Sequence, residues 1–196
     1  ALLKDSGAKM LKNGAVVVDS QGRTSLPDIY SAGDCASIYH KIMQKDVYIP
    51  LGTNANKQGR LVGAVIAGEA QELKGVLGSA VVKVMDLTLG KTGLGEEEAK
   101  NLGISYSTVT VHAPSHAAAY PNPKPITIKL VYEEKTKRLL GAQMAGEKGV
   151  AKRLDIFALA IDRGMTPEGL GWGDFWYSPP YATPWDAVQI AANAAK

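Results

Sequence analysis

The sequence is poor in cysteine and has no long hydrophobic run. Cys35 is the only cysteine in 196 residues, so no intrachain disulfide can form, and this scarcity favours a reducing, cytoplasmic compartment. No stretch approaches the ~18–20 consecutive apolar residues that a membrane-spanning helix needs. The N-terminus lacks a basic segment followed by an apolar one, so no signal peptide is predicted. We therefore expect a cytoplasmic protein with no membrane partner.

An excess of charge is also missing. The net charge is only +3 and the basic residues are dispersed, so nothing here predicts a nucleic-acid partner. With 45% hydrophobic and 21% charged residues, the composition is that of a folded globular protein and excludes wholesale disorder. The histidines predict no metal site, because Pro114 prevents one helix from presenting both His112 and His116. His40 is expected to be a solvated loop residue.

The first part of the chain is predicted to mix short strands with one helix. At its start, Leu2, Leu3 and Met10 follow a helical pattern with no capping residue, which suggests that the molecule begins upstream of Ala1. The other expected elements are a hairpin over 14–26, a strand over 29–32 and a helix over 55–67 that stops at Gly68. A polar stretch over 69–75 then predicts a boundary between two domains, 1–74 and 75–196.

The second part alternates strands with helices and predicts an α+β fold with an antiparallel sheet and flanking helices. The expected strands cover 81–89, 105–112, 126–132 and 138–144, and the expected helices cover 95–102, 150–161 and 185–195. The charged segment 133–137 joins the two strands beside it into an antiparallel hairpin. Acidic residues cluster at the start of the first helix and Gly103 follows its end, as the helix dipole and left-handed capping favour.

Two places in the first part favour a ligand. Asp34 directly follows Gly33 at the end of an expected strand, where its carboxylate can accept hydrogen bonds from sugar or polyol hydroxyls. A turn aspartate without a ligand is the alternative. The long helix is expected to have Thr53 or Asn54 as its N-cap, and free N–H groups at a helix start favour an anion. An ordinary cap is the alternative there.

Several motifs together resemble one family. They are TSLPDIYSAGDCA at 24–36, YIPLGT at 48–53, NKQGR at 56–60, GVLGS at 75–79, TGL at 92–94, LGAQ at 140–143 and YSPPY at 177–181. In order and spacing they resemble the FAD-dependent pyridine nucleotide-disulfide oxidoreductases, in the branch that holds coenzyme A-disulfide reductases, NADH oxidases and NADH peroxidases. The resemblance implies a C-terminal dimerisation domain preceded by an incomplete piece of an α/β FAD-binding domain.

The resemblance also implies where FAD would lie. Gly33 and Asp34 would bind the ribityl-phosphate side of the cofactor. The backbone of Leu51, Gly52 and Thr53, with the helix that follows, would face the pyrimidine edge of the isoalloxazine. This role is physically reasonable, because reduced flavin is negatively charged near that edge and a helix N-terminus stabilises negative charge.

Tyrosines are the catalytic candidates in the second part. In the family, the dimerisation domain completes the active site of the partner subunit, and the coenzyme A-reducing members use tyrosines there. Tyr120 and Tyr177 occupy the expected positions, and Tyr181 competes with Tyr177 for its role. A phenol can hydrogen-bond a thiolate or donate a proton, although each tyrosine could instead be an amphipathic packing residue.

Other expected family features are missing from the sequence. The first glycine-rich FAD fingerprint, the NAD-binding unit and the redox-active cysteine are all absent, and in the family they lie upstream. Cys35 follows the Gly-Asp of the flavin motif and is expected to be a buried, inert thiol. Lys152 and Arg153 are expected to solvate a helix face, with a coenzyme A phosphate as the alternative. The aromatic tail formed by Trp172, Phe175, Trp176 and Trp185 suits either a subunit interface or a core.

Two functions remain open from the sequence. In the first, the chain is the C-terminal portion of a homodimeric flavoenzyme that passes electrons from NAD(P)H through FAD to coenzyme A disulfide, a persulfide or oxygen. In the second, it is a non-catalytic dimerisation or interaction module that keeps the fold without redox activity. The terminal acceptor and the choice between NADH and NADPH are not specified by these residues.

Overall fold

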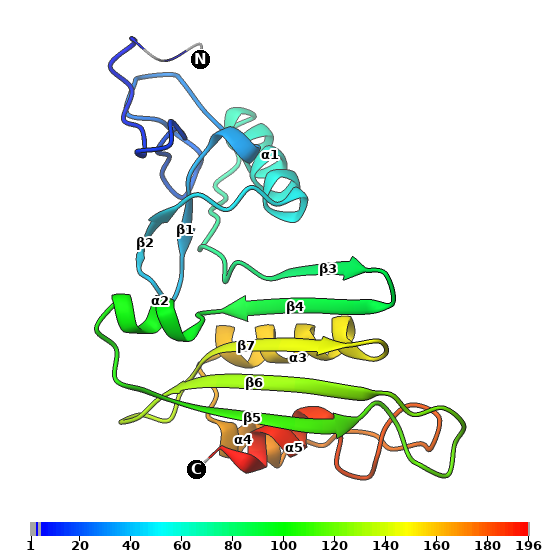
Figure 1. Ribbon diagram of the computed structural model, residues 1–196. Helices are drawn as coiled ribbons and strands as arrows, with labels where there is room; N and C mark the ends of the chain where they lie inside the picture. The colour runs from blue at the N-terminus through cyan, green and yellow to red at the C-terminus, as the bar shows by residue number, and fades with distance from the viewer. Residues whose placement is uncertain (1–2, 4, 196) are drawn as a thin grey trace. The chain divides into compact units, whose positions relative to one another are not determined.

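A computed structural model describes residue 3 and residues 5–195, and these form two compact units, Ala1–Val76 and Leu77–Lys196. Figure 1 shows the elements of each unit. Of the residues predicted to open the chain as a helix, Ala1, Leu2 and Lys4 lie outside the described part. Within it, residues 5–16 contain turns and an isolated bridge but no helix, so that expectation is wrong for them. No helix in the described part is long and apolar enough to span a bilayer.

The first unit has few regular elements. They are a 3₁₀ turn η1 (Gly33–Cys35), a two-stranded antiparallel ribbon of β1 (Ile38–His40) and β2 (Lys45–Val47), and helix α1 (Gly52–Ile66). Leu61 and Val65 form part of the buried face of α1. The helix stops at Gly68 as predicted, with this glycine at φ +92° and its N–H donating to the Val65 carbonyl at 3.0 Å.

The hairpin expected over 14–26 does not form a ladder. Val16 instead makes a parallel bridge to Ala36, with its N–H donating to the Cys35 carbonyl at 2.9 Å and its carbonyl accepting from Ser37 at 2.8 Å. The strand expected over 29–32 is likewise reduced to one bridge at Tyr30. The β-branched run buries its side chains by pairing with a distant segment, and this tertiary contact overrides the local hairpin tendency.

Two further expectations for the first unit are wrong. Helix α1 begins at Gly52 with Leu51 as its N-cap, so neither Thr53 nor Asn54 caps it. The Asn54 amide instead donates to the Ile49 carbonyl at 3.2 Å. His40 is not a solvated loop residue: it lies in β1, is 2% exposed, and its Nδ1 accepts from backbone N–H groups that follow it.

The second unit is built on a five-stranded antiparallel sheet of order β3-β4-β7-β6-β5. Its strands are β3 (Ala80–Val84), β4 (Leu87–Gly93), β5 (Tyr106–Pro114), β6 (Pro125–Glu133) and β7 (Leu139–Gly146). Its helices are α2 (Glu96–Asn101), α3 (Val150–Asp162), α4 (Pro167–Gly171) and α5 (Ala187–Ala194). The predicted α+β class, with an antiparallel sheet and flanking helices, is confirmed.

One face of this sheet carries the core. Helix α3 packs against β4 and β7, helix α5 packs against β5 and β6, and the two helices contact each other (Figure 1). The alternating strand β6 points Ile126, Ile128 and Leu130 to one face, and they are fully buried, as are Phe157 of α3 and Val188 of α5. Burial of each such side chain contributes about 1.5–3 kcal/mol to folding.

The sequence pattern missed a turn and a short helix in the second unit. Residues 81–89, expected to be one strand, are divided between β3 and β4 by a turn at Met85 and Asp86, with Met85 at φ +53°. This turn contains no glycine, asparagine or proline, and its single turn-favouring residue, Asp86, does not interrupt the strand pattern around it. Helix α4 was not predicted, although Thr166 caps it by accepting the Gly169 N–H at 3.1 Å.

Candidate functional site

The first group of candidate residues lies at the turn η1. Gly33 has φ +82°, a left-handed conformation that glycine adopts without strain. A Cβ built on it would lie 3.6 Å from the Cβ of Ala55, so helix α1 packs directly against this backbone. The side chain of Asp34, the next residue, is exposed. The turn therefore presents a carboxylate to solvent from a backbone that lies against a helix.

The second group lies at the start of α1. Leu51 is half-buried and extended, and its carbonyl accepts the N–H groups of Asn54 and Ala55 at 2.8 and 2.9 Å. Gly52 and Thr53 are exposed, and no side chain caps this helix. A Cβ on Gly52 would meet nothing within 4 Å. The first N–H groups of the helix are thus open to an external acceptor, which the positive end of the helix dipole favours as an anion.

One side chain joins these two groups. Gln58, on the buried face of α1, accepts the Gly33 N–H at 3.0 Å through Oε1 and donates to the Ser37 carbonyl at 2.8 Å through Nε2. Gln58 lies in the NKQGR motif but was not predicted to have a role in the site. A signal was present, because Asn54, Gln58, Leu61 and Val65 share one helical face, and a glutamine on an apolar face needs buried partners.

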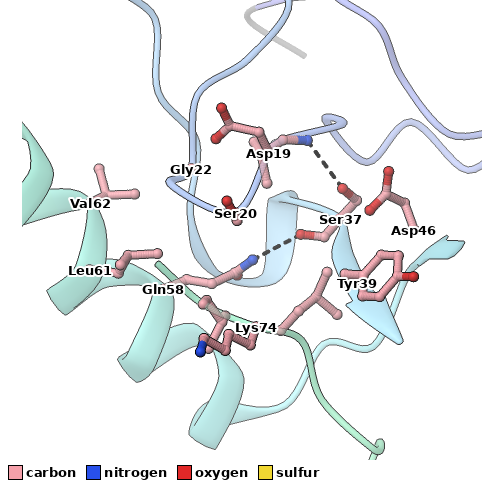
Figure 2. Close-up of a pocket in the computed structure, with 13 residues that line it drawn as sticks. Asp19, Ser20, Gly22, Ser37, Tyr39, Asp46, Gln58, Leu61, Val62 and Lys74 are labelled. Atoms are coloured by element: carbon pink, nitrogen blue, oxygen red, sulfur yellow. Dashed lines mark hydrogen bonds between the residues drawn. The ribbon is translucent and has the colours of Figure 1, made fainter. Parts of the chain in front are cut away.

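A hollow of about 270 Å³ lies on the other side of Gln58 (Figure 2). The charged residues that line it are Asp19, Asp46 and Lys74, and Leu61 and Val62 are among its apolar lining residues. In Figure 2 the Gln58 side chain reaches across toward Ser37, whose hydroxyl accepts the Val18 N–H at 3.2 Å. The hollow is lined entirely by the first unit.

The tyrosine candidates lie on two loops of the second unit. Tyr120, Tyr177 and Tyr181 are 46%, 48% and 64% exposed, so each phenol can reach a ligand or another subunit. The loops lie against each other, because the Ala117 N–H donates to the carbonyls of Pro179 and Ala182 at 3.2 and 3.1 Å. The structure thus brings together the segments that carry all three tyrosines.

Arg153 ties these loops to the helices, and the expectation that it solvates a helix face is wrong. It is 9% exposed, and its guanidinium forms a forked ion pair with Asp186, with Nη2 2.7 Å from Oδ2. The same Nη2 donates to the carbonyls of Ser115 and Tyr181, both at 3.0 Å. Lys152 behaves as expected, since its side chain is 96% exposed.

Aromatic side chains surround this network. Trp172, Trp176 and Trp185 are 77%, 69% and 48% exposed, so the aromatic tail is largely at the surface rather than in a core. Trp176 stacks edge-to-face on Tyr181 with ring centroids 5.9 Å apart. Beside them a groove of about 300 Å³ is lined by Trp176 and Tyr181 together with Ile156, Arg153 and other residues.

The loop that carries Tyr120 ends at another charge contact. The Lys124 ammonium lies 2.8 Å from a carboxylate oxygen of Glu147. This hydrogen bond, together with the attraction between the charges, raises the pKa of Lys124 above its usual value. The backbone N–H of Lys124 also donates to the Ser115 hydroxyl at 2.9 Å.

Cys35, His112 and His116 were predicted to have no catalytic or metal-binding role. Cys35 is exposed, which corrects the expectation of a buried thiol: it lies on the outer side of η1, near the Ser31 hydroxyl. His112 contacts the Thr127 hydroxyl at 3.0 Å. His116 is buried and contacts the Ser115 hydroxyl at 3.0 Å. Among residues 3 and 5–195, no three histidine, cysteine or acidic side chains are grouped to hold a metal ion.

Known proteins share both units. Residues 79–187 match the dimerisation domain of the pyridine nucleotide-disulphide oxidoreductases, and residues 1–59 match a further pyridine nucleotide-disulphide oxidoreductase domain. A CoA-dependent NAD(P)H sulfur oxidoreductase of Pyrococcus furiosus is 38% identical over 100% of this chain and 44% of its own length. An NADH oxidase of Enterococcus faecalis is 33% identical over 99% of the chain and 43% of its own length.

A solved structure agrees with these sequence matches. An NAD-dependent persulfide reductase from A. fulgidus superposes with a TM-score of 0.95 at 39% identity, over 99% of this chain and 36% of its own. The chain therefore spans less than half the length of the curated relatives and solved structures that it matches.

Proposed function

The chain belongs to the pyridine nucleotide-disulphide oxidoreductases, and on that premise we propose that it is the C-terminal portion of an FAD-dependent NAD(P)H oxidoreductase. It supplies one part of the FAD site from the first unit and a homodimer interface from the second. The relatives' names span CoA-dependent sulfur chemistry and NADH oxidation. The acceptor is accordingly a coenzyme A disulfide, a persulfide or oxygen.

The observation that carries this proposal is the pairing of Asp34 with the open start of α1. The residues fit the cofactor, because an exposed carboxylate suits ribityl hydroxyls and uncapped N–H groups at Gly52 and Thr53 suit the polar edge of a flavin. When bound, FAD accepts hydride and passes electrons on, which no side chain of this chain can do. Asp34 would bind and orient the ribityl side of the cofactor, and the start of α1 would stabilise negative charge on the flavin.

In the second unit the proposed roles are dimer contact and proton donation. The exposed tryptophans 172, 176 and 185 offer the large aromatic area typical of interfaces. Tyr120 and Tyr177 present their phenols from adjoining loops to the partner's site, where a phenol can hydrogen-bond a thiolate or give it a proton. Arg153 touches no substrate in this scheme; it holds the backbone of both loops.

The complete natural protein is expected to be a yellow homodimer. Size-exclusion chromatography with light scattering should give twice the monomer mass, and flavin absorbance should follow the protein peak. Addition of NADH or NADPH should bleach that absorbance. A colourless dimer without NAD(P)H turnover would instead favour a non-catalytic dimerisation module, and a monomer at high concentration would contradict the proposed interface.

The Tyr177→Phe variant of the complete protein is expected to reduce disulfide turnover while FAD stays bound. Removing one hydroxyl that donates a proton or hydrogen bond lowers kcat by roughly tenfold or more. Tyr181→Phe is the matched comparison, because its ring is already held against Trp176 and its carbonyl by Arg153. If Tyr181→Phe loses turnover and Tyr177→Phe does not, the role belongs to Tyr181.

A further inference from the structure

Gln58 is a buried polar side chain with both ends of its amide engaged. It is 6% exposed, its Oε1 accepts the Gly33 N–H, and its Nε2 donates to the Ser37 carbonyl. Its two partners are 25 and 21 residues away in the chain. Gly33 is the first residue of the turn η1 and Ser37 follows its end, so one side chain holds the entry and the exit of the segment that carries Asp34.

The chemistry of this contact requires an amide. The turn offers a donor on one side and an acceptor on the other, and among uncharged side chains of this length only glutamine supplies the complementary acceptor and donor. The Ser37 carbonyl is in turn linked to the chain before it, because the Ser37 hydroxyl accepts the Val18 N–H (Figure 2). Gln58 thus connects α1 through Ser37 to the 15–18 segment.

The position of Gln58 on α1 fixes the geometry between the two candidate ligand-binding groups. Gln58 lies six positions after Gly52, which corresponds to about 9 Å along the helix axis. Because α1 is rigid between these positions, holding Gly33 to Gln58 holds Asp34 at a set offset from the exposed N–H groups at Gly52 and Thr53. Ala55 also packs against Gly33, but this apolar contact does not fix where Gly33 lies along the axis of α1.

We infer that Gln58 is a positioning residue, which aligns the Gly33–Asp34 turn with the start of α1 so that both bind one flavin. The inference rests on the proposed function for the identity of the ligand. It assigns Gln58 no contact with the cofactor. The predicted consequence is that losing the amide weakens flavin binding more than it weakens the fold.

The test compares Gln58→Met with Gln189→Met in the complete natural protein. Gln189 is the matched control, since it is 5% exposed and its amide also accepts a backbone N–H, from Asp186, and donates to backbone carbonyls, at Gly171 and Gly173. Both variants lose the same kinds of bond. We expect the dissociation constant of FAD, measured by fluorescence titration of stripped protein, to rise roughly tenfold for Gln58→Met only.

A second readout does not depend on flavin. Hydrogen–deuterium exchange of the stripped protein should show faster exchange of the Gly33 amide in Gln58→Met and wild-type exchange there in Gln189→Met. Should Gln58→Met fail to fold, Gln58→Glu replaces it in the affinity measurement, because it removes the donor to the Ser37 carbonyl; it keeps an acceptor for the Gly33 N–H, so no faster exchange of that amide is expected for it.

The outcomes separate the two proposals. If wild-type protein binds no FAD, the proposed function is wrong, and the exchange experiment alone decides whether Gln58 holds the turn. If wild type binds FAD and Gln58→Met matches it in both affinity and exchange, the positioning role is overturned while the flavin proposal stands. Equal losses of affinity in Gln58→Met and Gln189→Met would also overturn it, because they would reflect stability alone.

Discussion

Replacing Asp186 with alanine is expected to lower the free energy of unfolding of residues 77–196 by about 3–5 kcal/mol. The Arg153–Asp186 side chains are each 11% exposed, and three N–H···O contacts of 2.7–3.0 Å join them. Without Asp186 the guanidinium keeps its charge, because arginine is not deprotonated in proteins. The buried positive charge of Arg153 then remains uncompensated next to the backbone of Ser115 and Tyr181.

Asp186 has a second structural role, which adds to this loss. Its carboxylate caps α5 by accepting the Val188 N–H at 2.9 Å, and loss of an N-cap costs about 1 kcal/mol. Asp186→Asn separates the contributions, since asparagine can still cap the helix but cannot neutralise Arg153. We expect the free energy of unfolding of Asp186→Asn to lie between those of the wild type and Asp186→Ala.

Urea unfolding followed by tryptophan fluorescence is the suitable measurement, because all three tryptophans lie in this unit. The matched control is Asp155→Ala, which breaks the pair with Lys152 at 3.3 Å on the exposed side of α3. Those side chains are 69% and 96% exposed, so little change is expected. If Asp186→Ala and Asp155→Ala unfold at the same urea concentration, the buried pair does not stabilise the unit.

The same pair illustrates what the sequence could and could not reveal. Helix α3 was predicted because Val150, Leu154, Phe157 and Ile161 recur at helical spacing, and periodicity reports which face of a helix is apolar. It does not report which charged residue at the edge of that face becomes buried. That depends on the partner, and Asp186 is 33 residues away from Arg153.

In the candidate site, too, the sequence predicted features with local signals and missed those that depend on tertiary packing. Asp34 and the loop that leads into α1 could be named as candidates because local features mark them, a Gly-Asp at the end of an expected strand and a loop entering a helix; their role in binding FAD stays a prediction. Gln58 was missed, and the burial of Cys35 was wrongly predicted, because each depends on how α1 packs against η1. The missed turn at Met85 has a related cause, since the pairing of β3 with β4 imposes a positive φ on Met85, a residue with no turn preference of its own.

Gly141→Ala is expected to destabilise the sheet strongly. Gly141 lies in the central strand β7, between β4 and β6. A Cβ at this position would overlap the Leu94 carbonyl oxygen and lie 2.7 Å from the Leu94 carbon and 2.8 Å from its nitrogen. All three are backbone atoms, so no rotamer change relieves the overlap.

The backbone at Leu94 cannot move aside to relieve this overlap. Its N–H donates to the Leu140 carbonyl at 2.9 Å, and its side chain is 1% exposed in the core. Relief therefore requires β4 and β7 to separate where they pair at Gly93 and Gly141. We expect a loss of about 3 kcal/mol or more, at the upper end for overpacking, or no folded second unit at all.

Gly169→Ala is the control for the glycine substitution itself. Its Cβ would meet only the Thr166 hydroxyl at 3.5 Å and a methionine terminus at 4.0 Å, so no loss of stability is expected. Circular dichroism and urea unfolding of the three proteins give the comparison. Wild-type stability of Gly141→Ala would mean that β4 and β7 do not approach this closely at Leu94.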